Sequence, residues 1–283
     1  MCAQVRTTPD GNCLSHACSL GVWGYHDHDA ELRRAVCATM AAPGAGGATR
    51  RRFSAALQRL GIPADQWAVE WGREMDAFAG SLRGGRGRSK AFLSDVHCFI
   101  LANVLRRPLV IYGGPMALAA GLAGVYLPLL WANTDEQPCS RVPTSLLFHR
   151  SHFSVLATME RAAGQVGEGH CSAVKDVTPT RSRAKAAATA AVADTGTRLP
   201  LAVELDGKVV PLPVRFLLPE EEKREGELLR AWMDIVPDAA ARAGGLPAGV
   251  KAFSLPPGAA PDGVLAAVEA TVKAHGESRE RKH

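Results

Sequence analysis

The spacing of apolar residues changes from helical to strand-like along this chain of 283 residues, and the change limits the folds that it can adopt. Helical spacing ends with the clearest helix, residues 93–105. Ser94 is placed to cap the start of this helix, and Pro108 is placed to terminate it. Short apolar segments bounded by turn residues follow at 109–112, 125–131, 145–149 and 153–159. We therefore predict an α/β (α+β) fold in which a helical front half packs on a central, mostly antiparallel or mixed β-sheet.

Further helices are predicted ahead of this change, at residues 14–20, 30–40, 50–60 and 64–78. Residues 41–48 are rich in Gly, Ala and Pro and are predicted as a break between helices. Residues 81–90 carry basic residues among glycines and are predicted as a loop. One stripe at helical spacing is typical of core packing, and it consists of Trp67, Trp71, Met75 and Phe78.

Residues 116–131 are nearly free of polar side chains, yet they do not predict a membrane span. A spanning helix needs about 20 consecutive apolar residues. This stretch is shorter, and Gly121, Gly124 and Pro128 favour a loop followed by a buried strand. We expect no membrane association.

The composition also bears on partners and compartment. The excess of 33 Lys and Arg over 28 Asp and Glu gives a net charge of +5, which is too small to favour a nucleic-acid partner. Seven cysteines at irregular spacing, with no signal peptide at the start of the sequence, do not resemble a disulfide framework. We expect free thiols in a reducing compartment, the cytoplasm or the nucleus.

One cysteine lies where a helix is predicted to begin. Residues 10–12 (Asp-Gly-Asn) are turn and capping residues, so Cys13 should occupy the first helical turn. The unpaired backbone amides and the positive dipole end at this position are expected to lower the pKa of Cys13 from about 8.5 to about 3.5–7.5. The same amides, including that of Leu14, are expected to hold an oxyanion.

The histidines and cysteines near this helix do not predict a metal site. The turn 26–29 (His-Asp-His-Asp) is too compact for all four side chains to bind one ion, and Asp27 or Asp29 is expected to cap the helix at 30–40 instead. The Cys-x-x-His-x-Cys pattern that begins at Cys13 lacks a second ligand pair at zinc-like spacing.

A base for the cysteine is expected in the sheet. His152 lies between two strand-like segments, where it would face a helix N-terminus from a rigid sheet edge. Separation in sequence is irrelevant, because nucleophile and base meet only in the folded chain. His149 is the competing candidate, and strand alternation would put it on the opposite face from His152 unless a turn intervenes.

Four blocks of sequence, in order, resemble the OTU (ovarian tumour) deubiquitinases, and in particular the Cezanne-like subgroup. The blocks are DGNCLSHACSLGVWGYHD at 10–27, HCFILANVLRRP at 97–108, GVYLPL at 124–129 and SHFSVLATME at 151–160. The resemblance covers most of residues 5–160. It implies a papain-like OTU fold, and it implies hydrolysis of isopeptide bonds at the C-terminus of ubiquitin or polyubiquitin, without a metal or cofactor.

The resemblance also implies roles for individual residues. Cys13 corresponds to the nucleophile, His152 to the general base, and Asp10 to the motif aspartate whose backbone region shapes the oxyanion hole. The supporting residues of this site are expected to be Asn12, Gly11, Leu14 and Thr7.

The group that orients the His152 ring is left open. Many OTU enzymes carry Asn or Asp two residues after the histidine, where this chain has Ser154, as in the Cezanne-like subgroup. Those relatives take a carboxylate from well upstream of the cysteine, and Asp10 is the only acid before Cys13 in this sequence. The alternatives are a missing N-terminal piece, Thr7, Ser154, a backbone carbonyl or another acid.

The second half of the chain is predicted to complete a catalytic domain of residues 1–236. A flexible insert rich in Ala, Gly, Lys and Arg is predicted at about 161–198. A hairpin of 201–205 with 209–217 is predicted around an Asp-Gly turn.

A further helix is predicted at 220–233, because Pro219 and an acidic first turn favour a helix start. Residues 237–283 are predicted to be a C-terminal extension with one helix, at 261–273, and a charged tail.

Two other functions fit these residues. The absent upstream acid allows a catalytically weak or inactive ubiquitin-binding module on an OTU scaffold. A papain-like protease for another substrate is the third alternative.

Overall fold

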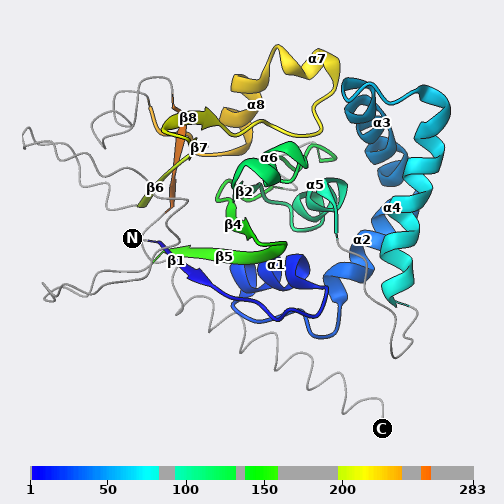
Figure 1. Ribbon diagram of the computed structural model, residues 1–283, viewed down its shortest axis with the longest axis horizontal. Helices are drawn as coiled ribbons and strands as arrows, with labels where there is room; N and C mark the ends of the chain where they lie inside the picture. The colour runs from blue at the N-terminus through cyan, green and yellow to red at the C-terminus, as the bar shows by residue number, and fades with distance from the viewer. Residues whose placement is uncertain (1, 83–92, 132–137, 159–196, 238–249, 256–283) are drawn as a thin grey trace, which may run out of the picture.

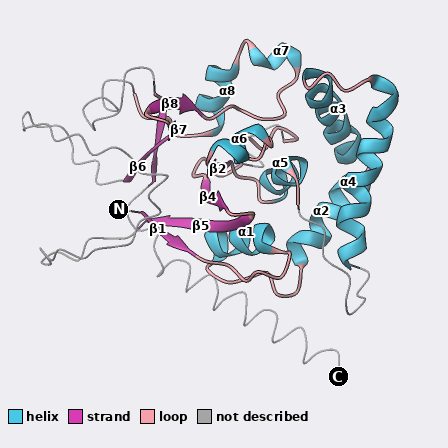
Figure 2. Cartoon of the chain, viewed as in Figure 1, coloured by secondary structure: helices cyan, strands magenta, loops and turns pink. Residues whose placement is uncertain are grey.

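The computed structural model describes residues 2–82, 93–131, 138–158, 197–237 and 250–255. Helices lie on more than one side of the central strands (Figure 2). In the described part of the chain, no helix is long and apolar enough to cross a membrane.

The helices follow one another through the front half and return near the end of the described residues (Figure 1). They are α1 (Cys13–Trp23), α2 (Glu31–Ala41), α3 (Pro43–Arg59), the 3₁₀ turn η1 (Ala64–Gln66), α4 (Trp67–Leu82), α5 (Asp95–Val104), α6 (Pro115–Ala119), α7 (Pro219–Glu222) and α8 (Glu225–Trp232).

The central sheet has five strands in the order β1-β5-β4-β2-β3, and it is mixed, as predicted. Strands β2 and β4 run parallel, and the other neighbours are antiparallel. The strands are β1 (Cys2–Val5), β2 (Leu109–Gly113), β3 (Gly124–Tyr126), β4 (Thr144–His149) and β5 (His152–Thr158). Two small antiparallel sheets pair β6 (Thr197–Pro200) with β9 (Ala252–Leu255) and β7 (Ala202–Leu205) with β8 (Lys208–Pro211).

Both faces of the sheet are buried, and the strand period of two separates their cores. On β2, Leu109 and Ile111 belong to the core shared with α1, α2 and α5, whereas Val110 and Tyr112 belong to a second core shared with β7, α8 and β9. This two-sided burial explains why the strand at 109–112 reads as a continuous apolar run.

Helix α1 lies directly against β4 and β5. Gly21 permits this approach, because a Cβ atom there would lie 2.6 Å from Thr144 Cγ2 and 2.8 Å from Val155 Cγ2. The contact brings the N-terminal end of α1, and with it Cys13, beside the β4–β5 hairpin.

The predicted capping residues are confirmed at two helices. Ser94 begins α5 with a capping box in which its backbone N–H donates to His97 Nδ1 at 2.9 Å. Of the two aspartates considered for α2, Asp27 accepts hydrogen bonds from the backbone N–H groups of Glu31 and Leu32.

Several predicted boundaries are wrong. Residues 41–48 are not a break, because α3 begins at Pro43, whose fixed φ suits the first helical position. The strand predicted at 125–131 ends at Tyr126, two residues before Pro128. The helix predicted at 220–233 is divided into α7 and α8.

Some predictions fall outside the described residues, including most of the loop at 81–90, nearly all of the insert at 161–198 and the helix at 261–273. The domain boundary at residue 236 stays a prediction. Beyond it, β9 pairs with β6, and Phe253 is fully buried in the second core.

Candidate active site

Cys13 is the first residue of α1, as predicted, and is only 6% exposed. The backbone N–H groups of Phe153 on β5 and Leu14 on α1 favour the Cys13 thiolate and act to lower its pKa. The candidate nucleophile therefore lies at the start of the helix, beside the strand that begins with His152.

The expected low pKa of Cys13 is wrong for the free protein. Burial raises the pKa of the thiol above its ordinary value, and the Asp10 carboxylate adds to the rise. The N–H groups of Phe153, Leu14 and Cys13 lower it, but burial outweighs them. The resting thiol is protonated at neutral pH, so it needs a base.

His152 is half-buried, and its ring is held by Thr7. The Thr7 hydroxyl donates to the backbone carbonyl of Phe153 at 2.6 Å, so its oxygen accepts from His152 Nε2 at 2.9 Å. The Thr7 carbonyl lies 3.2 Å from the same nitrogen. We assign the ring proton to Nε2 on this basis, which makes Nδ1 the nitrogen that can accept a proton.

Two of the groups left open by the sequence contact the ring: the Thr7 side chain and the Thr7 carbonyl. The Ser154 hydroxyl instead accepts a hydrogen bond from Gln4 Nε2 at 3.0 Å. Thr7 reaches His152 because β1 pairs with β5 in a register that sets Val5 opposite Val155. The sequence gives little sign of β1, since its four residues have no clear alternation.

His149 and His152 are directly opposite each other across the β4–β5 hairpin. A turn intervenes at Arg150 and Ser151, which both have positive φ. Directly opposed residues share a face of the sheet, so alternation does not separate the two histidines.

The loop before Cys13 is held by the carboxylate of Asp10. It accepts from the backbone N–H of Asn12 at 2.9 Å and from Asn12 Nδ2 at 3.1 Å, and it lies 3.2 Å from His16 Nε2. Burial acts to raise the pKa of Asp10, but the bonds from Asn12 and His16 hold it well below its usual range. Gly11 completes the loop with a φ of 82°, a conformation that favours glycine.

Sequence reasoning missed two buried neighbours of this loop. Arg33 on α2 is 1% exposed and donates from Nη1 to Asn12 Oδ1 at 2.5 Å. His16 is also 1% exposed, and its ring packs against those of His26 and His28 at centroid distances of 5.3 and 5.5 Å. The available signal was the position of Val36 on the apolar face of this helix. Arg33 precedes Val36 by three residues, so the two side chains lie on the same, inward face.

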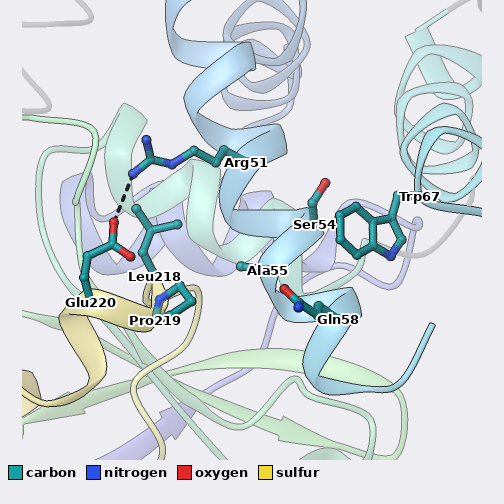
Figure 3. Close-up of a pocket in the computed structure, with 8 residues that line it drawn as sticks. All are labelled: Arg51, Ser54, Ala55, Gln58, Trp67, Leu218, Pro219 and Glu220. Carbon is teal, nitrogen blue, oxygen red and sulfur yellow. Dashed lines mark hydrogen bonds and ion pairs between the residues drawn. The ribbon is translucent and has the colours of Figure 1, made fainter. Parts of the chain in front are cut away.

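The described residues contain no group of three or more His, Cys, Asp or Glu side chains arranged to hold a metal ion. A surface pocket between α3 and α7 is a separate feature (Figure 3). Its lining does not include Cys13, and it consists of Arg51, Ser54, Ala55, Gln58, Trp67, Leu218, Pro219 and Glu220.

A cysteine at the start of a helix, beside a strand that begins with a hydrogen-bonded histidine, is the arrangement of a papain-like cysteine hydrolase. A model of the family described as "OTU-like cysteine protease" matches residues 8–153, which is more than half of the chain. The chain belongs to the OTU-like cysteine protease family.

Two curated relatives are much longer than the matching region. The chain is 30% identical over 237 residues to ubiquitin thioesterase trabid of Drosophila melanogaster, which covers 80% of this chain and 26% of that protein. It is 32% identical over 177 residues to tumor necrosis factor alpha-induced protein 3 of Mus musculus, which covers 55% and 22%, respectively. The chain thus spans about a quarter of the length of these relatives.

The chain is also similar to a solved structure, the viral OTU domain protease from Dera Ghazi Khan virus. The two share 14% sequence identity, with a TM-score of 0.35 over 56% of this chain and 82% of that one.

Proposed function

We propose that this chain is a thiol-dependent deubiquitinase that hydrolyses isopeptide bonds at the C-terminus of ubiquitin. The observation that carries the proposal is the hydrogen-bonded His152 ring, followed in the chain by the Phe153 amide, which acts to lower the pKa of the Cys13 thiol. The family supports the cysteine chemistry, and the name of the Drosophila relative, a ubiquitin thioesterase, supports the substrate.

The first half of the reaction would form an acyl-enzyme. His152 Nδ1 accepts the thiol proton of Cys13, and the sulfur attacks the carbonyl carbon of the scissile bond. The negative charge that develops on the carbonyl oxygen is held by N–H groups at the start of α1. The intermediate collapses as the protonated histidine returns its proton to the leaving lysine amine.

The second half would release ubiquitin. His152 accepts a proton from water, and the resulting hydroxide attacks the thioester carbonyl. The Cys13 thiolate leaves and takes the proton back from the histidine. Because burial favours the neutral thiol, Cys13 would rest as the thiol, and its proton would move to His152 when the substrate is bound.

A second function is favoured by the neutral group on His152. A hydroxyl stabilises a histidine cation less than a carboxylate does, and loss of the orienting acid costs about 10⁴-fold in the rate of serine proteases. A ubiquitin-binding module with slow turnover is therefore the alternative. The Cezanne-like subgroup is likewise a proposal.

Hydrolysis of a panel of isopeptide-linked diubiquitins tests the proposed function. We expect the wild-type chain to release monoubiquitin from at least one linkage, and we expect Cys13→Ala and His152→Gln to abolish the release. Binding of diubiquitin without cleavage would favour the alternative. Cleavage of unrelated peptides but of no diubiquitin would show a protease for another substrate.

A further inference from the structure

Asn12 occupies the N-cap position of α1 but does not cap the helix. Asparagine is among the best N-cap residues, because its side-chain oxygen normally accepts from the second or third backbone N–H of the helix. Here Asn12 has φ −109° and ψ 15°, outside the extended region usual for an N-cap, and it makes no side-chain capping bond. A preferred local interaction is therefore given up at this position.

The Asn12 side chain is held elsewhere by two charged residues. Its Oδ1 accepts from Arg33 Nη1 at 2.5 Å, and its Nδ2 donates to Asp10 Oδ2 at 3.1 Å. Asn12 is 5% exposed and Arg33 is 1% exposed, so water does not compete for these bonds. The oxygen that would cap α1 is thus engaged by the arginine.

The consequence lies at the first helical turn. A capping Asn12 would accept from the backbone N–H of Leu14 or Ser15, the second and third helical residues. The Asn12 side chain leaves these groups uncapped, and the Leu14 N–H acts to lower the pKa of the Cys13 thiol. The same group of amides is placed to receive the developing oxyanion of the proposed reaction.

Arg33 is well placed to control this turn. The side chain comes from α2, whose start is fixed by bonds to the Asp27 carboxylate, so it approaches Asn12 from a rigid element. A buried guanidinium needs hydrogen-bond partners, and the Asn12 carbonyl provides one. Burial lowers the pKa of Arg33, and the charges of Cys37, Asp10 and Cys13 oppose that effect, with Cys37 the strongest of the three.

We propose that Arg33 is a positioning residue that prevents Asn12 from capping α1 and so keeps the first-turn amides available to the Cys13 sulfur and to the oxyanion. The arginine acts through Asn12 and does not touch the reacting atoms. The role in turnover rests on the proposed function, whereas the role at the Cys13 sulfur does not.

The test is a double-mutant cycle between Arg33→Met and Asn12→Ala, because alanine cannot cap the helix. The substrate is ubiquitin with a fluorogenic amide at its C-terminus. Arg33→Met should lower kcat about 10- to 100-fold with little change in KM, because weakening an oxyanion donor costs no more than removing one, which lowers kcat about 100- to 1000-fold. Adding Asn12→Ala to Arg33→Met should recover most of that loss. The neighbour Arg34, half-exposed and paired with Glu31, provides the control, and Arg34→Met should leave kcat unchanged.

A second readout needs no ubiquitin. Alkylation of Cys13 by iodoacetamide at fixed pH, measured on the Cys13 peptide by mass spectrometry, should slow in Arg33→Met and recover in the double variant. If wild-type protein cleaves no ubiquitin substrate, the proposed function fails, and the alkylation cycle still decides the role of Arg33.

Equal losses from Arg33→Met with and without Asn12→Ala, in kcat and in alkylation, would overturn the proposal. Circular dichroism and thermal unfolding identify variants that do not fold. If Arg33→Met is among them, Arg33→Lys replaces it in the cycle, since it keeps the charge but loses the planar fork, and the same recovery by Asn12→Ala is expected.

Discussion

Thr7 Oγ1 lies 2.9 Å from His152 Nε2, so a neutral hydroxyl orients the candidate catalytic histidine. The hydroxyl is itself fixed, because it donates to the carbonyl of Phe153, the residue after the histidine. This pair of bonds favours the tautomer with the proton on Nε2, which leaves Nδ1 to accept a proton in the proposed reaction. The two bonds connect Thr7, which follows strand β1, to the histidine that takes part in the reaction proposed for Cys13.

Thr7→Val should lower kcat for ubiquitin substrates about 10-fold, because valine has the shape of threonine but cannot accept the bond from Nε2. The effect should be smaller than loss of a triad carboxylate, since the Thr7 carbonyl stays near the ring. Thr7→Ser should retain activity. Thr8 is exposed, and Thr8→Val is the matched control, with no expected change. Equal activity of Thr7→Val and Thr8→Val would show that the hydroxyl does not orient the base.

Two adjacent glycines in α3 should respond oppositely to alanine. A Cβ at Gly46 would lie 2.2 Å from the backbone oxygen of Met40, whereas a Cβ at Gly47 meets nothing within 4 Å. Gly46→Ala should lower the free energy of unfolding by about 1–2 kcal/mol, since overpacking exceeds the gain in helix propensity. Gly47→Ala should raise it by up to about 1 kcal/mol. Urea denaturation measures both, and a stabilising Gly46→Ala would contradict the packing of α2 on α3.

Two adjacent arginines in α3 should differ in their contribution to stability. Arg52 is buried and donates to the Phe216 carbonyl and to both oxygens of Glu221. Arg51 is exposed and pairs with Glu220 at 3.3 Å across the pocket rim (Figure 3). Arg52→Met should cost about 2–4 kcal/mol of unfolding free energy, and Arg51→Met less than about 1. Similar losses for both variants would rule out a specific role of Arg52 in holding Phe216 and Glu221 to α3.

Asp95 at the start of α5 should make the protein less stable as the pH rises. Burial raises the pKa of Asp95 to about 6, and the Glu74 carboxylate adds to the rise, although the Val96 amide and Arg215 oppose it. The folded state therefore holds this proton more tightly than the unfolded state, so the stabilisation is complete below about pH 4 and is lost as the pH passes 6.

Asp95→Asn removes this titration. The unfolding free energy of the variant, relative to wild type, should increase by about 2–3 kcal/mol between pH 4 and pH 7. Chemical denaturation at a series of pH values provides the measurement. A difference that stays constant over this range would show that Asp95 does not titrate as described.

Local patterns were sufficient for much of the fold and for the position of Cys13, the candidate nucleophile. The change from helical to strand spacing predicts the two layers, and a turn before a helix predicts Cys13 in the first turn, because these features depend on neighbouring residues. The start of α3 was missed because its Gly-rich sequence resembles a break. Gly46 is suited to that helix by its contact with Met40, which no local pattern contains.

The group that contacts the His152 ring and the pKa of Cys13 depend on contacts between distant parts of the chain. Thr7 is one of several candidates until β1 pairs with β5, about 150 residues away in sequence. The helix N-terminus correctly predicts amides that lower the pKa of Cys13, but only the folded structure shows that burial outweighs them. Arg33 was missed for the same reason, since its partner Asn12 lies on another element.

The most direct test of the proposed activity is capture by ubiquitin that carries an electrophile at its C-terminus. We predict one covalent ubiquitin per chain, which peptide mass spectrometry should locate on Cys13. Cys13→Ala should give no adduct, and capture should be slower for Thr7→Val than for Thr8→Val. Reversible binding of the probe without an adduct, or an adduct on another cysteine, would contradict the assignment of Cys13 as the nucleophile of a deubiquitinase.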